Sequence, residues 1–470
     1  MPSLTSVKYS NKKVMRIVRI AAVCVAAAAL LGFLIYYLLT SGIFYKKTDT
    51  DGKSYELTEK MQTAVKESDL QQGYMFSRTV KLLMEDRGMD PWVLSWYVIP
   101  GTTRSVPAME SAYVDTMDQV LLLASYIKEG KKSKAESLIK AIDASLTNEN
   151  GMLVAFAEAD KLITGGRTKE ERSELYEDPV YLQVAEAPVS MAATTEYLGV
   201  LMDYYDKWGK AETLDRIRDL SAKVMESGYE VYYRAADQLA MPTPIPVTEK
   251  SLVTPVPEET SEQDDIVVDT KEEGGEKEEA KLVSLSGIEL ASMDLDAMRR
   301  ASVLLPKYQE KYENIVSIVR DGKISETLPL YAWIYTDNGY MYYTGSDGNV
   351  DLVASLYVMV HLAEIGQLDA DAYAWVSEQI YNNGFLYESY NIMSGLAGSD
   401  VEASEAYPLV LYLAKIKGDD DLFAATYSAM TRNYATLSTS PALYTFFRNV
   451  ENSRIAVCAR ENLLMELLLE

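Results

Sequence analysis

The amino-acid sequence predicts an all-α fold, because apolar residues recur at helical spacing along most of the chain and short polar breaks separate these stretches. Residues 113–127, 198–205 and 352–363 each place apolar side chains three and four positions apart, which is the spacing of one helix face. Breaks such as 129–131 and 417–420 end such stretches. Roughly a dozen segments follow this pattern, and few convincing strands accompany them.

The short breaks between these segments limit the architecture. Short connections make consecutive helices antiparallel neighbours. Two arrangements suit such a chain: a solenoid of helical repeats, or a closed toroid of helical hairpins. No signature of fixed length recurs between the segments, which counts against a regular solenoid.

The N-terminal region predicts one membrane helix that precedes the helical part. No charged residue occurs in 20–45, whereas 1–19 contains five cations and no acid. About 20 apolar residues span a bilayer, and a basic flank keeps its end of the helix cytoplasmic. A cleaved signal peptide is the alternative, although its apolar core usually runs only about 7 to 15 residues. We therefore expect a cytoplasmic tail over 1–19, a single-pass anchor over 20–45 and an extracellular remainder.

Composition limits the partners of the extracellular part. The chain has 470 residues, of which 48% are hydrophobic, enough for a large core. Its formal charge is −25, and removal of the five cations in 1–19 leaves −30, which repels nucleic acid and anionic polymers. A neutral or cationic partner is favoured. Because Cys24 lies in the predicted anchor, Cys458 has no disulfide partner outside the membrane.

Residues 241–281 differ sharply in composition from their surroundings. Five prolines lie between 242 and 257, and twelve acidic but only four basic residues occur from Glu249 to Lys281. Such a segment buries too little apolar surface to offset its ordering entropy, so we expect disorder. It is either a linker between two domains or a loop inserted into one. We favour one core, with 46–240 and 282–470 as the two parts of a single toroid.

Several kinds of reaction centre are poorly supported. His361 is the only histidine, and it lies beside the apolar stripe of 352–363, where a packed or capping role is favoured. The absence of a second histidine and of clustered cysteines strongly disfavours the usual zinc sites. No strained nucleophile turn and no glycine-rich phosphate loop occurs either. The sequence therefore predicts no metal and no cofactor.

Carboxylates and aromatic side chains remain abundant. The chain has 34 tyrosines and five tryptophans, whose flat rings can stack on sugars and still form hydrogen bonds. A cleft lined by aromatic residues and holding two opposed carboxylates is what glycoside hydrolysis needs. The composition permits this chemistry, and it equally permits a non-catalytic helical scaffold that recruits partners of an envelope assembly.

The order of several segments resembles glycoside hydrolase family 8. Residues 115–131, which begin at Asp115 and end in Ala-Ser-Tyr-Ile-Lys-Glu-Gly-Lys, resemble the first catalytic helix of that family. Residues 193–198, leading into Trp208 and Gly209, resemble its segment in which an acidic motif opens a helix that closes on Trp-Gly. The likeness is closest to membrane-anchored or secreted relatives that accompany exopolysaccharide synthesis in Gram-positive bacteria. It continues through 293–296, 328–331, 383–387 and 461–464, and so covers most of 75–470.

The resemblance implies an (α/α)6 toroid with a sugar-binding cleft across one end. It further implies a polysaccharide substrate, inverting hydrolysis by two carboxylates and exopolysaccharide synthase components as partners. The chain also departs from the family. Asp115 occupies the place of the family's proton-donating Glu, and Thr194, Thr195 and Glu196 replace its paired aspartates. A misplacement of about 1 Å can cost on the order of a hundredfold in rate, so glycan binding without cleavage is the alternative.

These considerations give a set of candidate site residues. Asp115 is the expected proton donor, Glu110 is the alternative donor from a loop that enters the same helix, and Asp351 is the expected water-activating base. Helix capping is the competing interpretation for Asp115, Glu110 and Asp294, because acids are favoured at helix N-termini. The expected sugar-binding residues are Glu196, Asp294, Trp92, Trp96, Trp333 and Tyr331.

Overall fold

The structure is a computed structural model. Two predicted features lie outside the described residues: the membrane anchor over 20–45, apart from four scattered positions, and the acidic insertion over 241–281. No helix in the described part of the chain is both long and apolar enough to cross a membrane. The described residues are 48–68, 70–99, 109–162, 187–234, 282–342, 348–450 and 454–469, with isolated positions between 15 and 31.

Six helices in these ranges form a closed ring, in which each helix packs against the next and the last packs against the first. We call them the inner helices. The closure excludes a solenoid and agrees with the predicted toroid. In ring order the inner helices are α4 (Thr116–Lys128), α7 (Met191–Trp208), α9 (Leu295–Leu304), α11 (Leu352–Glu364), α13 (Ala406–Lys417) and α15 (Ala459–Leu469).

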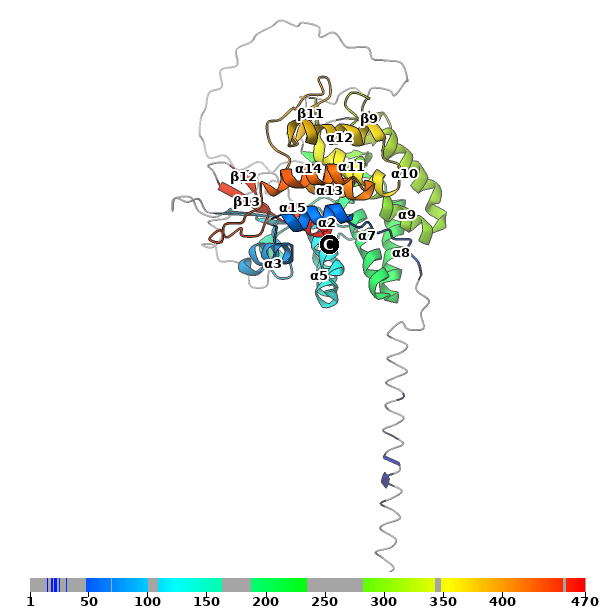
Figure 1. The fold of residues 1–470 in the computed structure, drawn as a ribbon. Coiled ribbons are helices and arrows are strands. Elements are labelled where there is room, and N and C mark those ends of the chain that lie inside the picture. Colours follow the sequence, from blue (N-terminus) through cyan, green and yellow to red (C-terminus); the bar gives the residue numbers. More distant parts are fainter. Residues whose placement is uncertain are drawn as a thin grey trace, which may run out of the picture.

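A second set of helices covers the ring from outside. Several of them lie at the rim of the molecule in Figure 1, where α3, α5, α8 and α10 surround the inner helices. The outer helices are α3 (Gln72–Leu83) on α15, α5 (Lys132–Ser145) on α4, α8 (Ala211–Glu226) on α7, α10 (Gln309–Asp321) on α9 and α14 (Asp420–Thr431) on α13, with α2 (Glu59–Glu67) and α12 (Ala370–Asn383) on α14.

The sequence of each helix explains its layer. Outer helix α5 buries only Ala135, Leu138 and Ile142, which lie three and four positions apart on one face. Inner helix α11 instead buries nine of its thirteen residues, on all sides. An amphipathic helix packs through one stripe, whereas a helix that is apolar all round belongs inside.

Short strands precede several inner helices, and the all-α prediction missed them. They span two to five residues, too few for an alternating pattern to be recognised. Strand β3 leads directly into α4, β10 into α11 and β13 into α15, so the strands fix where these helices begin. The antiparallel pairs are β1 (Trp96–Val98) with β2 (Met109–Glu110) and β13 (Arg454–Cys458), β12 (Arg448–Val450) with β13, β3 (Tyr113–Asp115) with β4 (Phe156–Glu158), β10 (Asn349–Asp351) with β11 (Ser389–Asn391), β5 (Glu230–Arg234) with β6 (Leu282–Ser286), and β8 (Ile334–Thr336) with β7 (Ile288–Glu289) and β9 (Gly339–Met341).

One hydrophobic core runs through both parts of the chain. It contains buried side chains from Met61 to Leu469 and includes inner helices from either side of 241–281. Strands β5 and β6 border that insertion and pair with each other, with Arg234 opposite Leu282. The two ends of the insertion therefore meet in one ladder, as expected of a loop inserted into a single domain.

The first described segment, residues 48–58, crosses the ring at the C-terminal ends of inner helices. We call it the N-terminal strap. The amide of Thr48 donates to the Tyr205 hydroxyl near the end of α7, at 3.1 Å. The Lys53 ammonium and the Tyr55 hydroxyl both donate to the carbonyl of Glu364, the last residue of α11. The strap thus lies at the end of the ring opposite the helix N-termini.

Candidate functional site

The N-terminal ends of the inner helices surround one cavity of about 570 Å³. Every inner helix contributes a polar side chain at or near its first residue. Because the helices are arranged as a ring, residues far apart in the sequence meet at this end. The six side chains are Asp115 before α4, Ser190 before α7, Asp294 before α9, Asp351 before α11, Glu405 before α13 and Arg460 in the first turn of α15.

Three of these acids cap their helices. Oδ1 of Asp115 accepts from the amide of Met117 at 2.9 Å, and Asp294 and Asp351 accept from the amides three residues ahead at 2.9 and 2.8 Å. The predicted capping of Asp115 and Asp294 is therefore confirmed. Capping does not exclude a second role, because a carboxylate has two oxygens and several lone pairs.

Arg460, in the lining of the cavity, contacts three acids. Its Nη2 lies 2.8 Å from Oδ1 of Asp115, and its Nε lies 2.5 Å from Oδ1 of Asp118. Its Nη1 lies 3.6 Å from Glu405, whose Oε1 also accepts from the Tyr357 hydroxyl at 2.8 Å. Burial raises the pKa of Asp118 to about 7, although Arg460 opposes this shift. One cation on α15 therefore contacts two acids at the start of α4 and the acid that precedes α13.

Glu196 lies in the second turn of α7 and lines the same cavity. Its half-buried carboxylate forms no hydrogen bond with the residues that the structure describes. Burial raises the pKa of Glu196 to about 7, an effect that His361 opposes and Glu364 reinforces. Glu196 is thus a carboxyl group that lines the cavity and that no described residue holds by a hydrogen bond.

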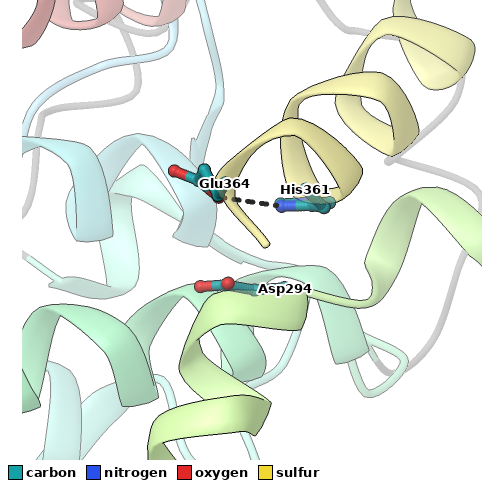
Figure 2. A group of neighbouring side chains, drawn as sticks. All are labelled: Asp294, His361 and Glu364. Carbon is teal, nitrogen blue, oxygen red and sulfur yellow. Dashed lines mark ion pairs between the residues drawn. The ribbon is translucent and has the colours of Figure 1, made fainter. Parts of the chain in front are cut away.

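Asp294 and His361, which line the cavity, form a cluster with Glu364 beside it that we call the floor cluster (Figure 2). His361 and Glu364 are one turn apart on α11, with Nδ1 3.8 Å from Oε2, and Asp294 approaches from the start of α9. Burial and the neighbouring Glu196 raise the pKa of Asp294. Burial lowers the pKa of His361, but Glu364, Asp294 and Glu196 outweigh it, so the net shift is upward.

Comparison with known proteins identifies the fold. No protein-family model and no curated protein matches the sequence. Among solved structures, an α-amylase from Clostridium perfringens matches with a TM-score of 0.58 and 17% identity, over 85% of this chain and 97% of that chain. This chain has the fold of that α-amylase.

Two further solved structures lie at lower similarity. A family 8 glycoside hydrolase complex with xylobiose from Teredinibacter turnerae matches with a TM-score of 0.49 and 7% identity, over 88% of this chain and 96% of that one. PssZ from Listeria monocytogenes matches with a TM-score of 0.48 and 9% identity, over 89% of this chain and 97% of that one. The closed ring of helices that the sequence predicts is thus the fold that this chain shares with the α-amylase.

The structure brings four of the predicted site residues to one cavity: Asp115, Asp351, Glu196 and Asp294. Glu110 is not among them, and the prediction that it shares this cleft is wrong. It lies in strand β2 opposite Tyr97 rather than in a loop that enters α4. Its Oε2 lies 3.7 Å from Nε of Arg87. The pairing of β2 with β1 thus places the Glu110 side chain beside Arg87 instead of in the cavity.

The predicted aromatic sugar contacts also lie outside this cavity. Trp92 and Tyr331 are each 2% exposed and pack in the core. Trp96 lines a neighbouring cavity of about 560 Å³, which shares Glu388 with the first. Trp333 does not line the cavity, but its Nε1 donates at 3.1 Å to Oε1 of Glu289, which does.

Sequence reasoning missed several residues of the cavity. Glu405 had a usable signal, because it directly precedes an inner helix, as Asp115, Asp294 and Asp351 do. The other missed residues have no such signal in the sequence, because loops and neighbouring helices place them at the cavity. The missed residues are Glu289, Tyr357, Glu388, Glu405 and Arg460 in the lining, and Glu364 beside it.

Proposed function

We propose that this chain binds a glycan in the acidic cavity and hydrolyses a glycosidic bond there by acid–base catalysis with two carboxylates. The observation that carries the proposal is the convergence of seven carboxylates on one open cavity at the helix N-termini. A volume of about 570 Å³ is within the usual range for ligand sites, roughly 300–1,000 Å³. The fold shared with an α-amylase supports a glycan as the ligand.

Glu196 is the proton donor that we propose, in place of Asp115. The oxygen Oδ1 of Asp115 already accepts from the Met117 amide and from the Arg460 guanidinium. An oxygen that two donors already hold serves better as an anchor than as a donor to a sugar. Glu196 has no such bond to a described residue, and it faces the cavity. Its proton would pass to the oxygen of the leaving sugar.

Asp351 is the proposed base. It is exposed to the cavity at the start of α11, where its cap to Ala354 engages Oδ1. It would take a proton from the water that attacks the anomeric carbon while Glu196 protonates the glycosidic oxygen. A water between base and sugar gives inversion, which requires the two carboxyl groups to lie roughly 6.5–9.5 Å apart.

Charge indicates the class of glycan. The cavity lining contains seven carboxylates against Arg460 and His361, so a neutral or cationic glycan is favoured over an anionic one. The aromatic face of Tyr357, half-buried in the lining, offers a surface on which a sugar ring can pack.

The cellular setting is part of the proposal. The uncharged stretch over 20–45 and its basic flank support a single-pass anchor with the toroid outside the cell. The expected association with exopolysaccharide synthase components is supported by the sequence resemblance alone, and it stays a prediction.

A panel of glycans tests the function. Residues 46–470 would be incubated with starch, β-1,4-glucan, chitosan and partially deacetylated poly-N-acetylglucosamine, and reducing ends and binding heats would be measured. We expect the protein to release reducing ends from at least one neutral or cationic glycan. Binding without release would favour the second candidate, a non-catalytic glycan-binding protein. Neither binding nor release would contradict both.

A further inference from the structure

We propose that the floor cluster binds one divalent transition-metal ion, with Asp294, His361 and Glu364 as its protein ligands. One ligand atom from each residue lies within 4.8 Å of the other two. Metal–ligand distances of about 2.0–2.2 Å place the ligand atoms of one ion at most about 4 Å apart. Small side-chain rotations are therefore enough to bring the three onto a common ion (Figure 2).

The imidazole of His361 is the first reason for an ion. The side chain is 6% exposed, and its Nδ1 has no hydrogen-bond partner within the described ranges. Oε2 of Glu364 lies 3.8 Å from Nδ1, which is too far for a hydrogen bond. A buried polar atom without a partner costs about 1–3 kcal/mol, and a bound cation would supply the missing partner.

The charge around the floor cluster is the second reason. The nearby cations are occupied elsewhere: Arg299 by Asp51 and Asp296, and Arg460 by Asp115 and Asp118. The groups that act on His361 come from three inner helices: Glu364 and Tyr357 on α11, Glu196 on α7 and Asp294 on α9.

This surplus of acids fits a divalent ion. Buried charges require partners, because removing them from water is costly. Two carboxylates, a neutral imidazole and a divalent cation together form an electroneutral site. Because such a site carries no net charge, it is compatible with the role proposed for Glu196 beside it.

Existing contacts orient two of the ligands. Oδ1 of Asp294 caps α9, and Oε1 of Glu364 accepts from the Tyr412 hydroxyl at 2.9 Å. Oδ2 of Asp294 and Oε2 of Glu364 are then the atoms that would bind the ion. Gly199 on α7 leaves room for this arrangement, since a Cβ there would lie 3.0 Å from Oδ2 of Asp294. Hydrogen bonds that orient metal ligands in this way typically support affinity.

The donor set selects the kind of ion. One imidazole nitrogen with two carboxylate oxygens suits Zn²⁺ or Mn²⁺, whereas Ca²⁺ prefers six to eight oxygen ligands. Three protein ligands leave at least one coordination position. Because Asp294 and His361 line the cavity, that position faces its interior and is open to water.

Metal analysis of the full chain, purified in detergent and stripped with a chelator, tests the site. After dialysis against Zn²⁺ or Mn²⁺ in the low micromolar range, we expect one equivalent of metal per chain and little Ca²⁺. His361→Asn and Glu364→Gln should each bind at least about tenfold more weakly. Glu388→Gln, which changes a cavity acid outside the floor cluster, should keep the full equivalent.

A second measurement does not depend on the variants. Because His361 is the only histidine of the chain, selective ¹⁵N labelling of histidine gives one imidazole whose nitrogen shifts report the ion directly. We expect Zn²⁺ to move these shifts with the same saturation point as the metal content. Unchanged imidazole shifts, or an equal metal content in a folded His361→Asn variant, would overturn the proposal and leave an adventitious ion only.

Discussion

Arg460 in the last inner helix lies 2.8 Å, Nη2 to Oδ1, from Asp115 at the start of the first inner helix. This ion pair ties the two ends of the ring together in the lining of the cavity. Asp115, which the sequence predicts as the proton donor, is therefore engaged in a contact that stabilises the ring. Substitution of Asp115 therefore tests the stability of the fold as well as its chemistry.

Asp115→Asn should lower the free energy of unfolding by about 1–3 kcal/mol, because it removes a charge-assisted bond to Arg460. Urea denaturation measures this change. Asp351→Asn is the matched control: it alters the equivalent cap of α11, which has no ion pair to a described residue, and Asn caps nearly as well as Asp. If Asp115→Asn unfolds like the wild type and yet stops hydrolysis, Asp115 is the donor after all.

Glu196→Gln should lower kcat by about 10²–10⁴-fold, since the amide cannot donate the proton. Glycan affinity and thermal stability should stay near wild-type values, because the side chain keeps its shape and loses no hydrogen bond to a described residue. Initial rates of reducing-end release and titration calorimetry provide the two readouts. The control Glu388→Gln, in the same lining, should keep its rate within a few-fold. Equal losses in both variants would point to a general charge effect instead of a specific donor.

Lys415 gives the fold a pH dependence that can be measured. It is 7% exposed, donates from Nζ to the Leu468 carbonyl at 2.7 Å, and has a pKa lowered by burial to about 8. Between pH 8 and 10 the unfolded chain, with a lysine pKa near 10.5, binds more protons than the folded chain. Stability should therefore rise with pH in this window, by roughly 1–3 kcal/mol relative to Lys415→Met.

The difference in free energy of unfolding between the wild type and Lys415→Met isolates the contribution of the lysine, because the contributions of other titrating groups cancel in that difference. Denaturant unfolding at pH 7, 8, 9 and 10 is sufficient. A constant difference across the series would mean that Lys415 keeps an ordinary pKa in the folded chain.

Deletion of 242–280 should leave one cooperative unfolding transition. Its borders, β5 and β6, pair directly, and a change in loop length alters closure entropy by only about 0.6 kcal/mol per doubling. Differential scanning calorimetry compares the deletion with the intact chain. Two separate transitions, or loss of cooperativity, would show that the segment supports the ring.

Part of the cavity lining could be predicted from the sequence, because acids that cap helices are recognisable and a ring of helices brings these caps to one end. An acid just before a helix is recognisable in sequence, and inner helices that begin at one end of a toroid bring such acids together. Asp115, Asp294 and Asp351 follow this rule. The same rule, applied to Glu405, would have added a fourth.

The remaining contacts depend on distances that spacing cannot encode. Asp294 and His361 meet because α9 packs against α11, although 66 residues separate them. Trp92 and Trp333 were chosen for their chemistry, yet nothing in their local pattern shows whether their side chains face the cavity. Glu110 was misplaced because a two-residue strand leaves no periodicity to read.

The crystal structure of Glu196→Gln with an oligosaccharide of the glycan that it binds tests the central claim most directly. We predict a sugar chain across the acidic cavity, with a glycosidic oxygen within about 3 Å of the residue 196 side chain and a water held by Asp351 on the opposite face. A sugar chain bound elsewhere, with the cavity holding only water, would contradict it.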